Sequence, residues 1–487
     1  MEKLIDLFLE KNPENFGERF KESFRELCSQ SGRYPLKALD EKAMRANWKS
    51  VEEGKVPYAA IIHPDNPSGG VYGGMSFVVF PIEGNSCLIA MGVGSQGLSP
   101  DEAILSRPGH SRKLNAICKW LNIKYGQGTM VAWAKTDPTR KDLPIPENIQ
   151  SLFPEYDNVF DRYGHELYAI IIPKDNRELA TIGAKAFIDL YYEERGIKPR
   201  AGKPITDSDK IREDYYQFLL PSLTEEEVFN QLLQRRFMII QGPPGTGKTK
   251  MAEDLISKRF QGHGKSIQFH PNTTYESFIG GLSPIKENDM IGFSFSPKKG
   301  HLMEAIEEAC KSKKPYLLHV DEINRADLGK VLGESIYLLE FQSKARTIDL
   351  SYDFGLPFGN SLALPDNLYI IGTMNSADRS IAILDIAVRR RFGFVSLWPQ
   401  LTVVSKFGSP KMVEAFKKLL QIFIEEASDE SFNLMPGHSY FLVGDDNIAG
   451  EQLRMNLVPL LEEYLLQGYV NSFSDTIRSY IQWVITL

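Results

Sequence analysis

The sequence predicts an α/β fold built on a parallel sheet with helices on both faces, preceded by an α+β domain and followed by a helical lid. Three observations predict it. Apolar runs typical of buried strands alternate with helical patterns after about residue 216. A glycine-rich turn joins the first of these runs to a helix. From about residue 402 the apolar spacing is helical.

The strands of the parallel sheet are expected where apolar runs are short and bounded by turn residues. These runs lie at 237–240, 266–270, 315–320 and 368–372. In the lid, the clearest helical patterns lie at 412–426 and 451–466. The core is therefore predicted over 216–398 and the lid over 399–487.

The first 195 residues are expected to form the α+β domain. Strand patterns lie at 58–62, 76–80, 86–91, 130–133 and 167–172, and helical patterns at 4–8, 16–27, 112–121 and 178–193. The segment 194–210 is polar, holds two prolines and two glycines, and lacks either periodicity. We therefore predict a linker over 196–215 between the domain at 1–195 and the core.

Composition sets the outer bounds. A chain of 487 residues with 42% hydrophobic and 24% charged residues is typical of a globular protein with several domains. No apolar stretch approaches the roughly 20 residues that span a bilayer, and the acids in the first ten residues exclude a secretory signal. We therefore expect a cytoplasmic protein without a membrane partner. Cys28, Cys87, Cys118 and Cys310 show no paired spacing, so neither a zinc site nor disulfides are expected.

The glycine-rich turn has the spacing of a triphosphate cradle. Its glycines let backbone N–H groups face phosphates, Lys248 reaches the β and γ oxygens, and Thr249 offers a hydroxyl to Mg²⁺. An ordinary glycine loop is the alternative, but a strand before it and a helix after it favour the nucleotide site. The residues expected at the nucleotide are Gly242, Pro243, Pro244, Gly245, Thr246, Gly247, Lys248 and Thr249.

Two further strand ends carry polar groups suited to phosphate hydrolysis. Asp321 ends one apolar run and can hold the water shell of Mg²⁺, while the adjacent Glu322 can polarise the attacking water. Asn375 ends another run and can bond both the γ-phosphate and that water. An arginine triplet at 389–391 can offset charge on a neighbouring subunit's nucleotide, or can simply be a solvated helix end.

These motifs, taken together, resemble the McrB family of AAA+ motors. The resemblance rests on DEINRAD at 321–327, MNSADRS at 374–380, RRF at 390–392, GHSYF at 437–441 and PLLEEY at 459–464. It covers roughly residues 219–464 and leaves the first 195 residues undefined. In the family the third residue of the second motif is Thr, where this chain has Ser376, which keeps the hydroxyl.

The resemblance implies a hexameric ring that binds GTP in preference to ATP, with Mg²⁺. It also implies a separate McrC-type subunit that stimulates hydrolysis and carries the nuclease. Arg325, Arg390 or Arg391 would complete the neighbour's pocket. Asp378 would either read a guanine edge or brace Arg379 or the subunit interface. The choice between GTP and ATP stays open, as does the role of His438, which is either a structural histidine or a nucleotide contact.

The family's N-terminal domains vary and usually recognise a DNA target. Although the net charge is −7, residues 101–145 hold eight Lys and Arg against four acids, which favours neither a phosphate-binding face nor a solvated one. Five aromatic residues accompany this segment and can hold a flipped or modified base, or can be core: Trp48, Tyr58, Tyr72, Trp120 and Trp133. The candidate DNA contacts are Arg107, His110, Arg112, Lys113 and Trp133.

The sequence therefore predicts a McrB-like ring that hydrolyses GTP or ATP and moves double-stranded DNA, modified DNA included, for a partner endonuclease. No spaced acid, acid, lysine set indicates a nuclease within this chain. Two alternatives remain open: an ATP-dependent MoxR-like protein remodeller, and a nucleotide-gated defence scaffold without translocation.

Overall fold

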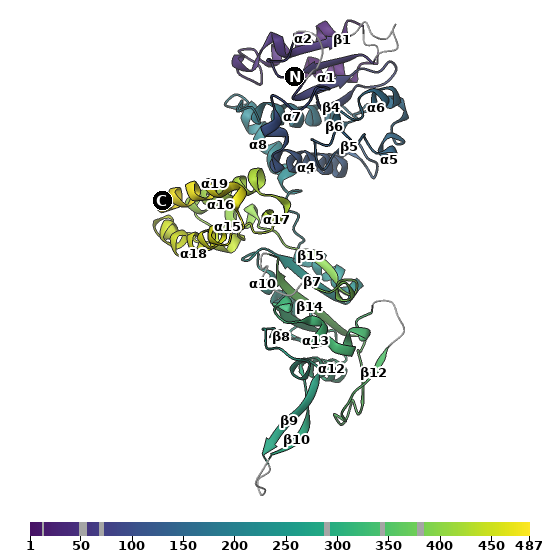
Figure 1. The fold of residues 1–487 in the computed structure, drawn as a ribbon, viewed down its shortest axis with the longest axis vertical. Helices are drawn as coiled ribbons and strands as arrows, with labels where there is room; N and C mark the ends of the chain where they lie inside the picture. The colour runs from purple at the N-terminus through teal and green to yellow at the C-terminus, as the bar shows by residue number, and fades with distance from the viewer. Residues whose placement is uncertain (12–13, 48–55, 68–72, 287–292, 341–345, 377–383) are drawn as a thin grey trace. The chain divides into compact units, whose positions relative to one another are not determined.

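The computed structural model describes residues 1–487 apart from 12–13, 48–55, 68–72, 287–292, 341–345 and 377–383 (Figure 1). The chain separates into two compact units. Unit 1 contains Met1–Leu220 and Ile424–Ser428, and unit 2 contains Pro221–Phe423 and Asp429–Leu487.

Unit 2 is built on a parallel sheet of five strands in the order β15-β7-β14-β11-β8. The strands are β7 (Phe237–Gly242), β8 (Gly264–Gln268), β11 (Tyr316–Asp321), β14 (Leu368–Asn375) and β15 (Gly393–Ser396). This sheet confirms the predicted α/β fold. Of its five strands, only β15 was not predicted from the sequence. Because β7 lies next to β14 and β14 next to β11, the carboxyl ends of these three strands meet at one edge.

Helices cover both faces of this sheet, as its apolar surfaces require. One face packs against α9 (Glu225–Arg235) and α10 (Lys248–Asp254), with Ala252 and Leu255 in the shared core. The other packs against α11 (Tyr275–Phe278), α12 (His301–Ser312) and α13 (Leu328–Leu332). Because both faces of the sheet are buried, successive side chains of a strand are apolar, as in the run at 237–240.

Two antiparallel hairpins extend the core and were not predicted. One pairs β9 (Gly280–Lys286) with β10 (Phe293–Lys299) between α11 and α12, and it projects away from the sheet (Figure 1). The other pairs β12 (Thr347–Asp349) with β13 (Ser361–Ala363). A proline lies within each of β9 and β10, and β12 and β13 have only three residues each, so neither hairpin shows a clear strand signal in the sequence.

The last part of unit 2 is helical, which confirms the expected lid. Its helices are α15 (Leu401–Phe407), α16 (Pro410–Glu426), α17 (Asp429–Phe432), α18 (Asp446–Leu466) and α19 (Ser474–Ile485). Phe416 of α16 meets Phe441 edge to face, with ring centroids 5.2 Å apart. The hydroxyl of Tyr480 in α19 donates to the carbonyl of Ala415 at 2.9 Å. These contacts hold the lid helices around one core.

Unit 1 is an α+β domain with a six-stranded antiparallel sheet in the order β1-β2-β3-β4-β6-β5. Its strands are β1 (Met44–Asn47), β2 (Tyr58–Ile61), β3 (Met75–Phe80), β4 (Leu88–Val93), β5 (Ala132–Ala134) and β6 (Leu167–Ile171). Its main helices are α1 (Glu2–Leu9), α2 (Phe16–Leu27), α4 (Pro108–Tyr125) and α7 (Arg177–Glu193), with the shorter α3 (Glu102–Leu105), α5 (Glu147–Gln150) and α6 (Asp157–Tyr163). Among these strands only β1 was not expected, because four residues are too few for a clear periodic signal, and the short helices α3, α5 and α6 were not predicted either.

The linker predicted over 196–215 is wrong for most of its length. Residues Lys203–Tyr216 form the helix α8, which belongs to unit 1. Pro204 lies in its first turn, where a proline is tolerated, and the preceding Gly202 has φ +89°, so two of the four residues that suggested a linker mark a helix start.

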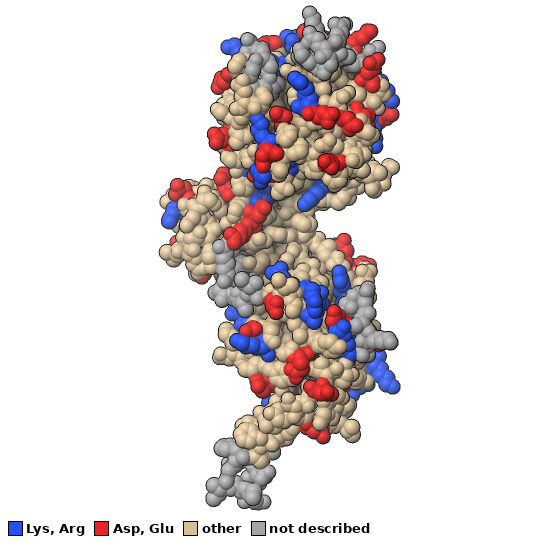
Figure 2. Space-filling model, turned by 45° about the vertical axis from the view of Figure 1, so that its right-hand side comes forward, with Lys and Arg blue, Asp and Glu red and all other residues tan. Residues whose placement is uncertain are grey.

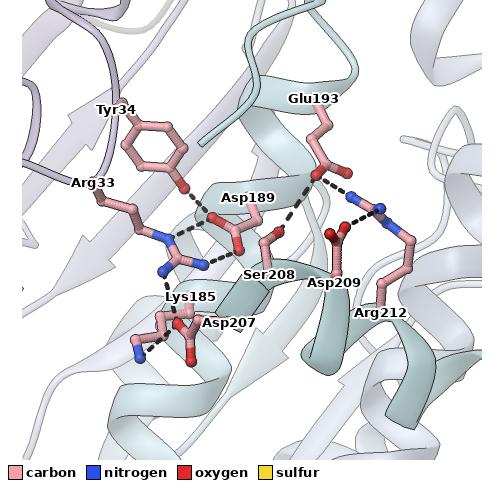
Figure 3. A network of polar contacts seen from close by, with 9 residues as sticks. All are labelled: Arg33, Tyr34, Lys185, Asp189, Glu193, Asp207, Ser208, Asp209 and Arg212. Atoms are coloured by element: carbon pink, nitrogen blue, oxygen red, sulfur yellow. Dashed lines mark hydrogen bonds and ion pairs between the residues drawn. The ribbon is translucent and has the colours of Figure 1, made fainter. Parts of the chain in front are cut away.

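Ion pairs rather than a broad apolar stripe fix α8 against α7, which explains its weak periodicity (Figure 3). Asp207 accepts from Arg33 at 2.7 Å and pairs with Lys185 of α7 at 2.9 Å. The guanidinium of Arg33 also donates from Nε to the buried Asp189 at 2.8 Å. Arg212 of α8 bonds Glu193 of α7. Because a buried charge without its partner is costly, this network makes α8 an integral element of the domain.

Candidate nucleotide-binding site

A cavity of about 330 Å³ opens where the carboxyl ends of β7, β11 and β14 meet. Its walls include Gly245, Lys248, Thr249, Asp321, Glu322 and Asn375. The register of the sheet causes this grouping, because Asn375 lies opposite Gly242 and Val320 lies opposite Gly372. Predicted site residues from three separate motifs therefore lie around one cavity.

The loop between β7 and α10 needs its glycines for two reasons. Gly245 and Gly247 have φ of +79° and +80°, a region that L side chains rarely adopt. A Cβ at Gly245 would also lie 2.4 Å from the hydroxyl oxygen of Ser439 in the lid. The lid segment holds this loop from outside, since the N–H of Gly437 donates to the carbonyl of Pro244 at 2.8 Å. Turn conformation and close packing thus both exclude larger residues.

Lys248 is buried at the base of this loop. Its ammonium donates to the carbonyl oxygens of Gly242 at 3.0 Å and Pro243 at 2.8 Å. Burial lowers the pKa of Lys248 to about 8, although the nearby carboxylates Asp321 and Glu322 act in the opposite direction. A cation held in a dry site beside backbone N–H groups is suited to bind phosphate oxygens.

Asp321 ends β11 beside the first turn of α10. Its Oδ1 accepts a hydrogen bond from the hydroxyl of Thr249 at 3.1 Å and another from the hydroxyl of Thr373. A hydroxyl and a carboxylate side by side are the hard oxygen donors that Mg²⁺ takes, usually with water completing its shell. Thr249 and Asp321 therefore fit a magnesium–triphosphate, and they are the described residues that would hold the metal.

Glu322 points toward Asn375 and Arg325. The amide of Asn375 donates to Oε1 at 3.0 Å, and Nε of Arg325 lies 3.3 Å from Oε2. Glu322 itself has φ +51°, a left-handed conformation that is uncommon for glutamate. Backbone strain of this kind persists where surrounding structure imposes it and is concentrated at functional sites.

The arginine triplet lies outside the cavity walls. Arg389 and Arg390 are exposed at the end of α14 (Ile386–Arg389), and the guanidinium of Arg389 lies 5.6 Å from the ring centroid of Phe394. Arg391 is half-buried and donates to the carbonyl of Ala387 at 2.7 Å. The three neighbours therefore differ in how far their guanidinium groups are already engaged within the chain.

His438 belongs to the lid segment that covers the loop. Its Nδ1 accepts from the N–H of Gln400 at 3.4 Å, and burial lowers its pKa to about 4. These observations describe a neutral, partly satisfied histidine. Ser439 and Thr373 also line the cavity and were not among the predicted site residues. Ser439 lies within the GHSYF motif, but that motif alone assigned it no role, and Thr373 lies outside the quoted motifs. Asp378 and Arg379 lie outside the described residues.

The predicted DNA contacts at 107–113 are for the most part engaged inside unit 1. Lys113 is buried and pairs with Glu194 at 2.6 Å and Glu425 at 2.8 Å. His110 is fully buried, with Nδ1 3.6 Å from a Glu194 oxygen. Burial alone would raise the pKa of Glu194, but the neighbouring His110 and the charge of Lys113 lower it to about 2.

The remaining candidates near this segment are also held by the fold. Arg112 donates to the carbonyl oxygens of Ile424 at 2.6 Å and Ala427 at 2.7 Å. Arg107 pairs with Glu194 at 3.6 Å and, like Arg112, is only partly buried. Basic and acidic side chains are interspersed on the face that Figure 2 shows. The prediction that His110 and Lys113 contact phosphates is therefore wrong for this structure, because both are buried against carboxylates.

A second cavity, of about 360 Å³, lies in unit 1 against the sheet. Three aromatic rings line it: Tyr58, Phe80 and Tyr163. The rings of Phe80 and Tyr163 have centroids 5.3 Å apart, and Tyr58 meets Tyr163 edge to face at 6.3 Å. Arg162, Glu166 and Ser76 supply polar groups at its walls. Trp133 is half-buried and packs against the core cluster to which these aromatics also belong; Trp48 and Tyr72 lie outside the described residues.

The structure also describes the cysteines, possible metal-ligand clusters and the length and polarity of the helices. Cys28, Cys87 and Cys118 are buried free thiols and Cys310 is exposed. Within the described ranges no group of three or more His, Cys, Asp or Glu side chains is arranged to hold a metal ion. Among the helices described, none is both long and apolar enough to cross a membrane.

The fold and the cavity define a class of protein: residues 237–392 match the AAA domain of the dynein-related subfamily. The chain is 29% identical over 350 residues to the type IV methyl-directed restriction enzyme EcoKMcrB subunit of Escherichia coli K12, covering 66% of this chain and 75% of that protein. It is 31% identical over 195 residues to the type II restriction enzyme BsuMI component YdiS of Bacillus subtilis 168, covering 33% of this chain and 56% of that one. These likenesses confirm the resemblance to the McrB-like AAA+ nucleoside triphosphatases that the motifs indicated.

A solved structure from Cytophaga hutchinsonii shares 14% identity and covers 58% of this chain and 98% of that one. Its TM-score of 0.24 is too low to bear on the arrangement of the domains.

Proposed function

We propose that this chain is a GTP-preferring McrB-like motor that assembles as a ring, recognises DNA through unit 1 and moves DNA for a partner endonuclease. The observation that carries the proposal is the grouping of Lys248, Thr249, Asp321, Glu322 and Asn375 around one cavity. Each of these side chains has a distinct task in phosphoryl transfer to water.

Lys248 would bind the β and γ oxygens, where its positive charge stabilises the transferring phosphoryl group. Thr249 and Asp321 would hold Mg²⁺, which neutralises charge on the same oxygens. Glu322 would polarise the attacking water, and Asn375, already bonded to Glu322 at 3.0 Å, would orient that water and the γ-phosphate. The loop residues 242–249 would supply backbone N–H groups, with Asp378 a candidate for the base.

The ring and its partner rest on family likeness. An arginine from the next subunit is proposed to complete each pocket, with Arg390, Arg391 and Arg325 as the candidates. Relatives named as a restriction enzyme subunit and a restriction enzyme component favour a role in restriction with a further subunit. A McrC-type partner would carry the nuclease, because the sequence holds no nuclease pattern of its own.

A comparison of GTP with ATP tests the nucleotide assignment. We expect the purified full-length chain to hydrolyse GTP at least about tenfold faster than ATP at saturating Mg²⁺, a difference of about 1.4 kcal/mol in the barrier. Release of inorganic phosphate measures both rates in parallel. A clear ATP preference would favour the MoxR-like remodeller, and hydrolysis without displacement of a roadblock on DNA, partner present, would favour the scaffold.

The aromatic cavity of unit 1 supports a role in base recognition. Its volume and its three rings suit a planar heteroaromatic ring, because aromatic faces stack on bases while polar groups read their edges. Arg107, Arg112 and Trp133, all partly buried, remain candidates for contacts with the neighbouring DNA backbone. We propose that the target base enters this cavity.

Tyr163→Ala should weaken DNA binding by about tenfold, since stacking on one base contributes roughly 1–3 kcal/mol. Tyr163→Phe, which keeps the ring, should bind like the wild type. Fluorescence anisotropy of the full-length chain with plain, methylated and hydroxymethylated duplexes at one fixed salt concentration measures the effect, because salt alone shifts such affinities. Equal binding by Tyr163→Ala and Tyr163→Phe on every duplex would remove this cavity from DNA recognition.

A further inference from the structure

Four polar side chains lie in a row across the central sheet of unit 2, from its edge strand β8 to the acidic end of β11. Ser266 Oγ lies 3.0 Å from His319 Nδ1. His319 Nε2 lies 3.3 Å from Thr373 Oγ1, and the Thr373 hydroxyl bonds Asp321 Oδ1. Both His319 and Thr373 are buried, with 0% and 1% of their surfaces exposed.

The strand register creates this row. His319 lies opposite Ser266 on β8 and opposite Ile371 on β14. Because side chains alternate along a strand, Asp321 and Thr373, each two residues further on, project to the same face of the sheet as His319. This is the face that packs against α10, the helix that begins at Lys248 and carries Thr249.

The donors and acceptors of the row have one consistent direction. An ionised carboxylate only accepts, so the Thr373 hydroxyl donates to Asp321. The oxygen of Thr373 then accepts from Nε2–H of a neutral His319. The other ring nitrogen, Nδ1, is left to accept the hydroxyl proton of Ser266. Every polar atom of the buried histidine ring is thereby satisfied, and its tautomer is fixed.

A satisfied polar group in a core can be merely structural, so the end point of the row is the decisive observation. The row ends on Oδ1 of Asp321, the same oxygen that accepts from the Thr249 hydroxyl at 3.1 Å. Two hydroxyl donors on one oxygen hold the carboxylate plane of Asp321, a residue that lines the cavity. Partners of this kind commonly orient the groups that bind a metal.

We propose that Ser266, His319 and Thr373 form a relay that fixes the Asp321 carboxylate for the magnesium–triphosphate. The three are positioning residues: they act through Asp321 and not on the nucleotide. The relay rests on the magnesium site of the proposed function, but it assigns work to residues that no motif of that site includes.

The test measures how strongly Mg²⁺ enhances nucleotide binding, and it needs no turnover. A fluorescent, non-hydrolysable GTP analogue is titrated into the full-length chain with Mg²⁺ and, separately, with EDTA. In Thr373→Val, which keeps the shape and removes the hydroxyl, we expect the enhancement by Mg²⁺ to fall about tenfold while affinity in EDTA is unchanged. Thr373→Ser keeps the hydroxyl and should restore the enhancement.

His319 provides a second pair of variants. His319→Leu removes the donor to Thr373 and should lower the enhancement in the same direction. His319→Gln offers an amide N–H to Thr373 in place of the ring N–H and should recover most of it. Thermal unfolding of each variant identifies one that fails to fold, in which case the Thr373 pair alone decides.

The outcomes separate the relay from the site itself. If Mg²⁺ strengthens binding equally in Thr373→Val and wild type, or if Thr373→Val loses affinity equally with Mg²⁺ and with EDTA, the relay is refuted. If Mg²⁺ strengthens binding in neither wild type nor variants, the magnesium site of the proposed function fails and the relay with it. Loss confined to Mg²⁺, with recovery in Thr373→Ser, supports the relay.

Discussion

Glu322→Gln is expected to lower the rate of nucleotide hydrolysis by about a thousandfold while leaving nucleotide affinity within about twofold of wild type. A positioned general base typically contributes 10²–10⁴-fold, and an amide cannot polarise water as a carboxylate does. The bond from Asn375, which donates to Oε1 at 3.0 Å, can persist in the variant because the amide oxygen of Gln also accepts. The change therefore removes the chemistry and retains the contact.

Two measurements on one protein preparation check this expectation. Phosphate release at saturating GTP and Mg²⁺ gives the rate, and titration with a fluorescent GTP analogue gives the affinity. Glu308→Gln is a matched control: the same chemical change at an exposed carboxylate whose ion pair, at 3.3 Å, is with Lys311 of its own helix. It should hydrolyse GTP at the wild-type rate.

Arg325 gives this prediction a second consequence. In the wild type its Nε lies 3.3 Å from Glu322 Oε2, and in Glu322→Gln this charge pairing is lost. Since half of the Arg325 side chain is solvated, the effect on stability should be small. A variant that hydrolyses GTP at the wild-type rate would exclude Glu322 as the residue that polarises water; a variant that no longer binds nucleotide would give it a binding role instead.

The grouping of the candidate nucleotide site could be predicted from the sequence because its determinants are local. The loop at 242–249 and the pair Asp321 and Glu322 each lie directly after an apolar strand, so strand, turn and chemistry are read together. That Asn375 faces Glu322 follows from the neighbouring positions of β11 and β14. By contrast, His319 and Thr373 could not be predicted as partners, since only the register of two strands brings them together.

The errors in unit 1 have a common physical cause. His110, Lys113 and the polar residues of α8 are charged or polar in sequence, which suggested a phosphate-binding face and a linker. In the fold Lys113 pairs with Glu194, and Asp207 of α8 pairs with Arg33 and Lys185, partners that lie outside its own helix. Pairing of buried charges is a tertiary property, so composition and periodicity alone cannot distinguish it from solvent exposure.

Arg390→Ala is expected to reduce GTP hydrolysis in the assembled protein by about a thousandfold, the lower range for an arginine that stabilises a transferring phosphoryl group. The contacts of the three arginines indicate which of them is available to reach a neighbouring subunit. Arg391 is half-buried and donates to Ala387 at 2.7 Å, while Arg389 lies over the ring of Phe394. Arg390 is exposed and outside the walls of its own subunit's cavity, as an arginine that reaches a neighbour must be.

Mixing two inactive variants tests whether Arg390 acts on a neighbour. Lys248→Ala removes the phosphate-binding ammonium but keeps Arg390, whereas Arg390→Ala keeps a complete cavity. If the arginine acts across a subunit interface, a mixture should regain a measurable fraction of wild-type GTP hydrolysis, because a complete cavity then meets an intact Arg390. Neither variant alone can form this pair, so activity of the mixture above the sum of the two separate preparations is the decisive signal.

Arg389→Ala serves as the adjacent control, and Arg390→Lys asks whether charge alone suffices. A guanidinium can donate two parallel hydrogen bonds to phosphate oxygens, which an ammonium cannot, so Arg390→Lys should recover only part of the rate. If Arg389→Ala is inactive and Arg390→Ala hydrolyses GTP normally, Arg389 and not Arg390 is the arginine that acts on the neighbouring nucleotide. The proposed role of an arginine from the triplet would then still hold. If all three single variants of the triplet retain activity, Arg325 becomes the remaining candidate, and its pairing with Glu322 would then have to break before it could reach the neighbouring nucleotide.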